Sequence, residues 1–302
     1  MRGTGPRAST HRVRSGIEGV RHARPATDTG VATDPRDGDR EVLALVATPF
    51  TTVADAHRRL LALERLFVTR EDRRAVFLSI YARVTELVGD AIDRGTFEDG
   101  EWVARYLVAF ANLYRQALYD YETGDLDALS DPWQLAFEAA ARGDCLVVQD
   151  AMLGINAHIN YDLAFALHEA GVATNRRRKY ADHCTVNEIL RCLVDEAQDT
   201  LAADYDAPGI TTVDESMGRL DEVLSIRTIR EGRDSAWRNA CALDSRWAVR
   251  RRLARWVTRV TATGAAHLLL SPNASSRVHG ALREFEGRLG EAETTDDRVT
   301  ED

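Results

Sequence analysis

The stretch from 144 to 171 constrains the fold of this chain most strongly. It reads DCLVVQDAMLGINAHINYDLAFALHEAG, without proline and with glycine only at Gly154 and at its end, Gly171. A glycine just past the last apolar residue is typical of a helix end, so the stretch predicts one long α-helix. With residues about 100° apart, both sides of this helix mix large apolar residues with a few polar ones. We therefore expect other helices to surround it.

The remaining chain also shows helical periodicity, and it shows no alternating strand pattern. The fourth predicted helix begins with Ser130, Asp131 and Pro132 and stops at Gly143. The basic segment NRRRKY that follows the central helix predicts a solvated loop. We expect an all-α fold, a single domain of about nine helices packed around the buried central helix. The other helices are predicted over residues 53–67, 71–94, 97–122, 181–203, 213–243 (one helix or a kinked pair), 245–270 and 276–289.

Both ends of the chain differ in composition from its middle. Residues 1–40 are rich in Arg, Gly, Pro, Thr and Asp, and they show no apolar periodicity, which predicts a disordered N-terminal extension. No apolar segment follows their arginines, so they do not resemble a signal peptide. Whether they belong to the native protein stays open. Residues 291–302 are charged and predict a disordered acidic tail, which leaves 41–290 as the helical domain.

Charge and apolar run length exclude two classes of protein. No apolar run approaches the roughly 18 residues that a transmembrane helix needs, so we expect no membrane span. The first two dozen residues are basic, so the remainder is more acidic than the net charge of −9 suggests. That balance argues against a general nucleic-acid binder. No Cys-x-x-Cys pair and no secretory signal occur, so we expect a cytoplasmic protein with reduced cysteines at Cys145, Cys184, Cys192 and Cys241.

Lys179 is the only lysine in the chain. Scarce lysine with abundant Asp and Glu suits a salt-adapted, halophilic cytoplasm, in which carboxylates keep the surface hydrated. A GC-rich genome that favours arginine codons is the alternative, although it does not account for the acidic excess.

The candidate site is the pair His158 and Asp162 on the central helix. Their i, i+4 spacing lets the carboxylate orient the imidazole for acid–base catalysis, or lets both side chains bind one divalent metal ion. A buried structural histidine–aspartate pair fits the same spacing. A metal site needs further ligands from other helices, and the candidates are His57, Asp150, Asp182 and His183.

Other polar residues are predicted to turn inward and form a supporting network. Asn156 and Asn160 lie about 160° from His158 on an ideal helix, so we expect them to bridge to other helices instead of sharing its pocket. An inward Arg115 needs a carboxylate, for which Asp162 or Asp182 is a candidate. The rest of the network is Tyr119 and Asn187.

The run from Arg233 to Trp237 predicts a tryptophan packed in the helical core, with the arginine stem lying along it. Established catalytic signatures are missing from the sequence: there is no Gly-x-Ser-x-Gly, no phosphate-binding Gly-x-x-x-x-Gly-Lys, no His-Glu-x-x-His and no paired Glu-x-x-His.

The run GINAHINYDL at 154–163 resembles a family of domains of unknown function, the 5995 type, found in actinobacteria and haloarchaea. The stretch 182–198 and the run 233–237 support the resemblance, which covers most of residues 41–290 and implies an all-helical fold without a known reaction. Isoleucine stands at 155, where the family usually has methionine. A looser likeness, through the His-x-x-x-Asp helix, is to zinc-dependent phospholipases C and single-strand nucleases, whose other metal histidines have no clear counterparts here.

Two functional hypotheses follow. In the first, the protein is an enzyme or small-molecule binder with a polar cleft at His158 and Asp162, a metal-dependent hydrolase in its sharpest form. In the second, it is a non-catalytic helical scaffold or protein-interaction module, in which His158, Asp162, Asn156 and Asn160 form a structural network. Substrate, metal and oligomeric state stay open.

Overall fold

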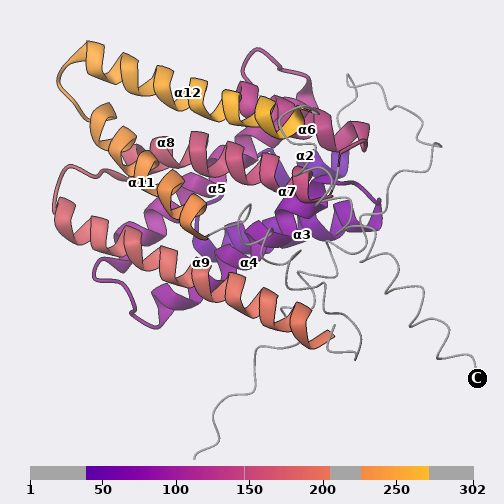
Figure 1. Ribbon diagram of the computed structural model, residues 1–302, viewed down its shortest axis with the longest axis horizontal. Helices are drawn as coiled ribbons and strands as arrows, with labels where there is room; N and C mark the ends of the chain where they lie inside the picture. The colour runs from indigo at the N-terminus through magenta and orange to yellow at the C-terminus, as the bar shows by residue number, and fades with distance from the viewer. Residues whose placement is uncertain (1–38, 146, 205–225, 272–302) are drawn as a thin grey trace, which may run out of the picture.

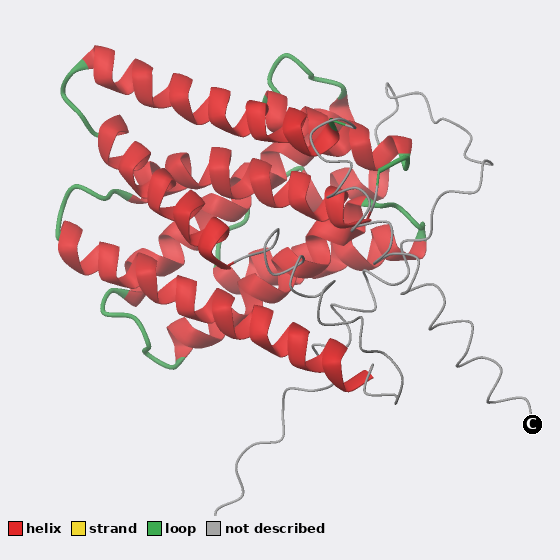
Figure 2. Cartoon of the chain, in the orientation of Figure 1, coloured by secondary structure: helices red, strands yellow, loops and turns green. Residues whose placement is uncertain are grey.

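The computed structural model describes residues 39–145, 147–204 and 226–271. Within these ranges all regular structure is helical and no strand occurs, which confirms the all-α prediction (Figure 2). The elements are α2 (Arg40–Val46), α3 (Val53–Thr69), α4 (Arg74–Asp93), α5 (Gly100–Thr123), α6 (Asp131–Arg142), α7 (Val147–Ile155), η1 (Asn156–Asp162), α8 (Leu163–Ala170), α9 (Arg176–Asp204), α11 (Ile226–Leu243) and α12 (Ala248–Leu270).

The helices largely follow the predicted pattern. When α7, η1 and α8 are taken as one interrupted helix, the described residues form nine helices. The sequence prediction missed α2, and it placed NRRRKY in a loop although α9 begins at Arg176. Lys179 within this segment is buried, and its ammonium donates to the Gly171 carbonyl at 2.7 Å. Several predictions lie outside the described residues: those for 1–38, for 276–289, for 291–302 and for the first part of 213–243.

Local sequence signals set the helix ends. Thr52 accepts a hydrogen bond from the Asp55 backbone amide at 3.0 Å, and Asp99 caps α5 in the same way. Gly124 and Gly143 follow α5 and α6 with φ of 72° and 65°, the left-handed conformation that glycine adopts most readily. The Pro132 start and the Gly143 stop of α6 match the prediction.

The interrupted helix α7–η1–α8 lies in the middle of the molecule (Figure 1). Its first part contacts α4 and α6, its middle part contacts α11 and α12, and its last part contacts α5 and α11. One hydrophobic core joins these elements, with Leu153, Leu163 and Leu167 of the central helix fully buried in it. The prediction of a buried central helix is therefore confirmed, but its middle seven residues are a π-helix and not α-helix.

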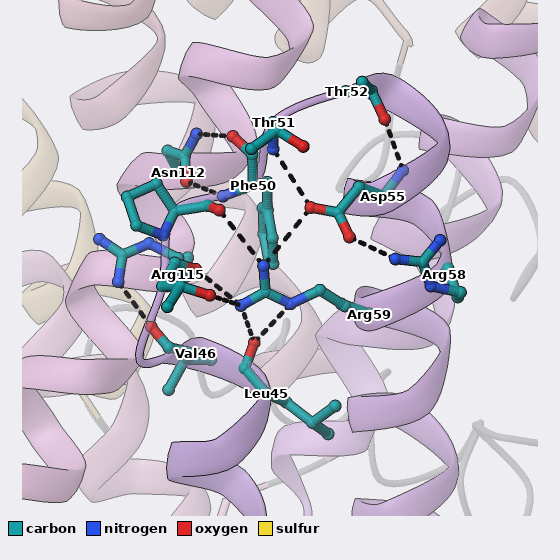
Figure 3. A network of polar contacts seen from close by, with 12 residues as sticks. Leu45, Val46, Phe50, Thr51, Thr52, Asp55, Arg58, Arg59, Asn112 and Arg115 are labelled. Carbon is teal, nitrogen blue, oxygen red and sulfur yellow. Dashed lines mark hydrogen bonds and ion pairs between the residues drawn. The ribbon is translucent and has the colours of Figure 1, made fainter.

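A polar network fixes the connection between α2 and α3 against α5 (Figure 3). The Arg59 guanidinium donates to the Leu45 carbonyl at 2.8 Å and to the Thr48 carbonyl at 2.6 Å, and it lies over the Phe50 ring. From α5, Asn112 exchanges two hydrogen bonds with the Phe50 backbone, at 2.7 and 2.9 Å. These bonds satisfy backbone groups that a helix end leaves free, so the network has a structural role.

None of the described helices is both long enough and apolar enough to cross a lipid bilayer.

Candidate functional site

The NAHINYD segment forms the π-helix η1, in which the backbone is wound more widely than in an α-helix. The Leu163 amide donates to the carbonyl of His158, five residues earlier, and not to that of Ile159. π-Helical turns are rare, and they are frequently found at functional sites. This segment contains every polar residue that the sequence analysis singled out on the central helix.

The imidazole of His158 is buried in a cage of aromatic rings. It stacks on Phe110 of α5 with ring centroids 3.5 Å apart, and Tyr81 of α4 meets it edge-on at 4.3 Å. Phe77, Tyr114 and Trp133 complete the cage at 5.7, 6.4 and 5.9 Å. Only 3% of the His158 side chain is exposed. The cage therefore separates the ring from bulk water.

Asp162 is the polar partner of His158 inside this cage. Its Oδ2 lies 3.0 Å from Nδ1 of His158, and it accepts a hydrogen bond from the Trp133 indole at 2.8 Å. The spacing i, i+4 thus brings the two side chains together even though the backbone is π-helical. Both partners of the carboxylate come from buried side chains, because 4% of the Asp162 side chain is exposed.

Burial acts on both ionisable groups against charge. It lowers the pKa of His158 well below that of a free histidine and raises the pKa of Asp162 well above that of a free aspartate. The Trp133 hydrogen bond opposes the second shift in part, since it stabilises the carboxylate. The pair is therefore a neutral imidazole beside a carboxyl group that resists ionisation.

The second ring nitrogen of His158 has no hydrogen-bond partner among the described residues. Nε2 is fully buried, and only aromatic rings surround it. A buried polar atom without a partner costs roughly 1–3 kcal/mol, so such atoms are rare in native proteins. This nitrogen is the one position in the cage where a further donor or acceptor has a free site to bind.

Asn156 and Asn160 lie on the other side of η1. Asn156 donates to the Ala262 carbonyl of α12 at 2.8 Å, and Asn160 donates to the Asn156 side chain at 2.9 Å. The two asparagines therefore bridge the π-helix to α12 and stay separate from His158. Gln149 of α7 makes a similar bridge to the Leu269 carbonyl, also on α12.

Two glycines permit the close packing around η1. A Cβ atom on Gly154 would lie 2.5 Å from the Phe77 ring, which is part of the His158 cage. On α11, a Cβ atom on Gly232 would lie 2.7 Å from the side-chain oxygen of Asn160. Larger residues at either position would displace the neighbouring helix, so these glycines hold the π-helix between α4 and α11.

A second buried polar cluster joins α5, α9 and α11. Arg233 of α11 is 2% exposed, and its guanidinium donates to the Asn187 side chain at 2.6 Å and to the His183 carbonyl at 2.9 Å. The Tyr106 hydroxyl lies 3.5 Å from two of its nitrogens. Trp237 packs against Trp102 and His183, so this tryptophan lies in the core as predicted, whereas Arg233 is itself the centre of a network.

His183 is neutral in this cluster. Burial and the positive charge of Arg233 lower its pKa well below the usual value. Its Nε2 lies 3.2 Å from the Arg233 carbonyl and its Nδ1 lies 3.3 Å from a guanidinium nitrogen. These distances suit a tautomer in which Nε2–H donates to the carbonyl and Nδ1 accepts from the arginine. Both ring nitrogens are thereby satisfied.

The remaining candidates lie apart from His158. Arg115 donates to the Val46 carbonyl at 2.6 Å and to Gln116, so the expected partnership with Asp162 or Asp182 is wrong. Asp182 instead accepts from the backbone amides of Glu98 and Asp99, at 2.7 and 2.8 Å. Three other candidate positions are also occupied by local structure: Tyr119, half-buried on α5; Asp150, paired with Arg73 at 2.6 Å; and His57, half-buried on α3.

The proposed metal ligands do not converge. Within the described ranges, no three His, Cys, Asp or Glu side chains lie close enough together to hold a metal ion. His158 and Asp162 supply two donors, but the other sides of the cage are formed by aromatic carbon. Cys145, Cys184 and Cys241 are free thiols elsewhere in the structure.

Comparison with protein families gives one match. The family described as "Family of unknown function (DUF5995)" matches residues 53–272, which is more than half of the chain. The chain belongs to this family. The match runs from the first residue of α3 to just past α12, so the DUF5995 region includes the His158 cage and the Arg233 cluster. Neither the curated proteins nor the solved structures include a match to the chain.

Sequence reasoning found the polar centre of the cage but not its walls. Phe77, Tyr81, Phe110, Tyr114 and Trp133 come from three helices, and each is part of an ordinary apolar stripe in the sequence. The Arg233–His183–Asn187 cluster was also missed, because its members lie on two helices about 50 residues apart and form no linear motif.

Proposed function

We propose that this DUF5995 protein is a non-catalytic helical scaffold, in which His158 and Asp162 hold the central helix in register and do not act on a substrate. The observation that carries the proposal is the enclosure of both side chains, which are 3% and 4% exposed behind aromatic rings. A general acid or base must come within hydrogen-bond reach of its substrate. Here a substrate would first have to displace one of the rings.

The electrostatics support the same proposal. A histidine that acts as acid and base near neutral pH needs a pKa near the working pH. Burial moves the pKa of His158 well below that range, and the pKa of Asp162 rises at the same time. The pair thus loses the charge that would bind a metal ion or orient a catalytic imidazole, while its hydrogen bonds still fix the π-helix against α6.

A comparison of three proteins tests the proposal: wild type, Asp162→Asn, and His168→Ala as a control at a partly exposed histidine outside the cage. Each is assayed for bound metal by mass spectrometry. Each is also assayed for hydrolysis of p-nitrophenyl acetate, p-nitrophenyl phosphate and bis-p-nitrophenyl phosphate, with and without added Zn²⁺, Mn²⁺ or Mg²⁺. We expect no stoichiometric metal and no turnover that depends on Asp162. Metal or turnover lost only in a folded Asp162→Asn protein would contradict the scaffold proposal.

One observation favours a second candidate, a binder of a small neutral molecule at His158. The buried Nε2 atom has no partner among the described residues, and the π-helix places it deep in the cage. A ligand with one hydroxyl or N–H group would satisfy this nitrogen and stack among the rings. Native mass spectrometry of the purified protein tests this candidate, which predicts a bound mass in the wild type that is absent from His158→Phe.

A further inference from the structure

The outer face of α12 carries a stripe of exposed apolar side chains. Val249, Leu253, Trp256 and Val260 follow one another at intervals of four, three and four residues, and they are 45–77% exposed. Leu268, 67% exposed, continues the stripe beyond Gly264, where an added Cβ atom would meet nothing within 4 Å. Such spacing places the residues on one side of the helix. A continuous apolar face of this kind marks an interaction surface.

Charge restricts what can cover this face. The helix contains five arginines and no acidic residue between 248 and 270. Arg250 and Arg252 are exposed beside the stripe, and no carboxylate pairs with either among the described residues. Two α12 helices from separate copies would bring like charges together, which opposes pairing of identical faces. The occupant is therefore expected to be acidic and amphipathic.

The segment that directly follows α12 in the sequence has both properties. Residues 272–302 contain eight Asp and Glu against four arginines. Their apolar residues Val278, Leu282, Phe285 and Leu289 recur at intervals of four, three and four, the same spacing as in the α12 stripe. Two helices pack well when such spacings match, because the side chains of one fit between those of the other. A short helix with glycines at 280 and 287 also needs packing for its stability.

We propose that residues 276–289 fold back as an antiparallel helix on the exposed face of α12. The turn at Ser271 to Ser275 contains Pro272, which suits a helix end. In this register Val278 faces Leu268, and Phe285 faces Val260. Leu282 lies over Gly264, where the missing side chain leaves room for it. Leu289 reaches Trp256, and the acidic residues 291–297 come alongside Arg250, Arg251 and Arg252.

Covalent attachment strengthens the proposal over an external partner. The segment starts two residues after the end of α12, so its effective concentration at the stripe is in the millimolar range typical of short linkers. The basic N-terminal residues are poor competitors for an arginine-rich surface.

Disulfide trapping tests the register. The pair Val260→Cys with Phe285→Cys is compared with the control pair Val260→Cys with Val278→Cys, which shares one site but is shifted by two helical turns. After mild oxidation, peptide mass spectrometry identifies the linked peptides, so the native cysteines do not confuse the result. We expect the 260–285 link within one chain, in at least tenfold excess over the 260–278 link. Equal yields, no link, or a link between two chains would overturn the proposal.

Tryptophan quenching gives a second readout that does not depend on oxidation. Trp247 and Trp256 are the exposed tryptophans of the described residues, and only Trp256 lies under the proposed helix. The double variant Leu282→Ser with Phe285→Ser should raise acrylamide quenching at least twofold in a protein whose other tryptophans are Phe except Trp256. The same double variant in a protein that keeps only Trp247 is the control and should change little. Unchanged quenching of Trp256 would contradict the docking.

Discussion

Two histidines are buried in this protein, and their surroundings differ in one decisive respect. His183 has both ring nitrogens in hydrogen bonds and lies beside the cation of Arg233. His158 lies beside a carboxyl group, stacks on Phe110, and has one ring nitrogen without a partner among the described residues. Burial keeps both rings neutral. The comparison teaches that a neutral buried histidine arises either from complete hydrogen bonding or from enclosure by carbon.

The difference also separates the two sites in their tolerance to change. The Arg233 cluster is held by hydrogen bonds between α5, α9 and α11, whereas the His158 cage is held by ring packing between α4, α5, α6 and η1. Removal of a hydrogen-bonding centre leaves several polar groups unsatisfied, and removal of one ring from a packed cage leaves a cavity. We expect larger losses at the first site.

Arg233→Ala is expected to have the largest effect. It leaves the Asn187 side chain and the His183 carbonyl buried without their donor, which should lower the free energy of unfolding by about 4 kcal/mol. Urea unfolding followed by circular dichroism measures the change. The exposed Arg238 on the same helix provides the control, because Arg238→Ala should stay within about 0.5 kcal/mol of wild type. Equal effects of the two variants would remove the special role of the cluster.

His158→Ala is expected to cost somewhat less, about 3 kcal/mol, since it opens a cavity against Phe110 and leaves Asp162 with only Trp133. The matched variant His158→Phe refills the cavity and should recover part of the loss. Thermal and urea unfolding give both values. A phenylalanine variant less stable than the alanine variant would show that the ring is held by its hydrogen bond and not by packing.

Stability should depend on pH in opposite directions when either member of the pair is removed. With Asp162→Asn, the neutral His158 remains, and the unfolded chain gains a proton below about pH 6.5 that the folded chain refuses. Stability then falls as the pH drops through this range.

With His158→Phe, Asp162 remains with its raised pKa, so the folded chain keeps a proton that the unfolded chain loses above about pH 4. Stability then falls as the pH rises, until the pH passes the folded-state pKa. Each slope has a limit of about 1.4 kcal/mol per pH unit. Unfolding is measured against the double variant as the baseline, and slopes of the same sign would contradict the neutral pair.

Trp133→Phe should have the smallest effect. It removes one hydrogen bond to Asp162 but keeps an aromatic ring against Phe137, so we expect a loss of about 1 kcal/mol. Trp247→Phe serves as the control, since Trp247 is 65% exposed. A loss above about 3 kcal/mol for Trp133→Phe would mean that the carboxyl group, and not the rings, governs the stability of the cage.

The sequence predicts the fold better than the site, and particular residues show why. Pro132 and Gly143 determine the ends of α6 through their own backbone preferences, so these ends can be read locally. His158 and Asp162 also meet as predicted from their spacing. The π-helix between them has no local signal, because helical periodicity was analysed at about 100° per residue, and the same residues satisfy a wider turn.

The partners of the polar residues depend on packing between distant helices. Arg115 was expected to meet a carboxylate, but α2, which the sequence analysis missed, offers it the Val46 carbonyl. Asp182 was expected near the site, but it binds backbone amides before α5. Such pairings follow from helix positions in space, and single-sequence periodicity contains no information about them.

The most direct test of the neutral, enclosed pair is an NMR titration of the histidine ring signals between pH 5.5 and 8, with His158 assigned by the His158→Phe variant. The account predicts that the ¹⁵N and ¹H shifts of His158 stay constant over this range, as do those of His183. A His158 signal that titrates with a midpoint near pH 6.5 would contradict it, because the imidazole would then exchange protons as a free histidine does.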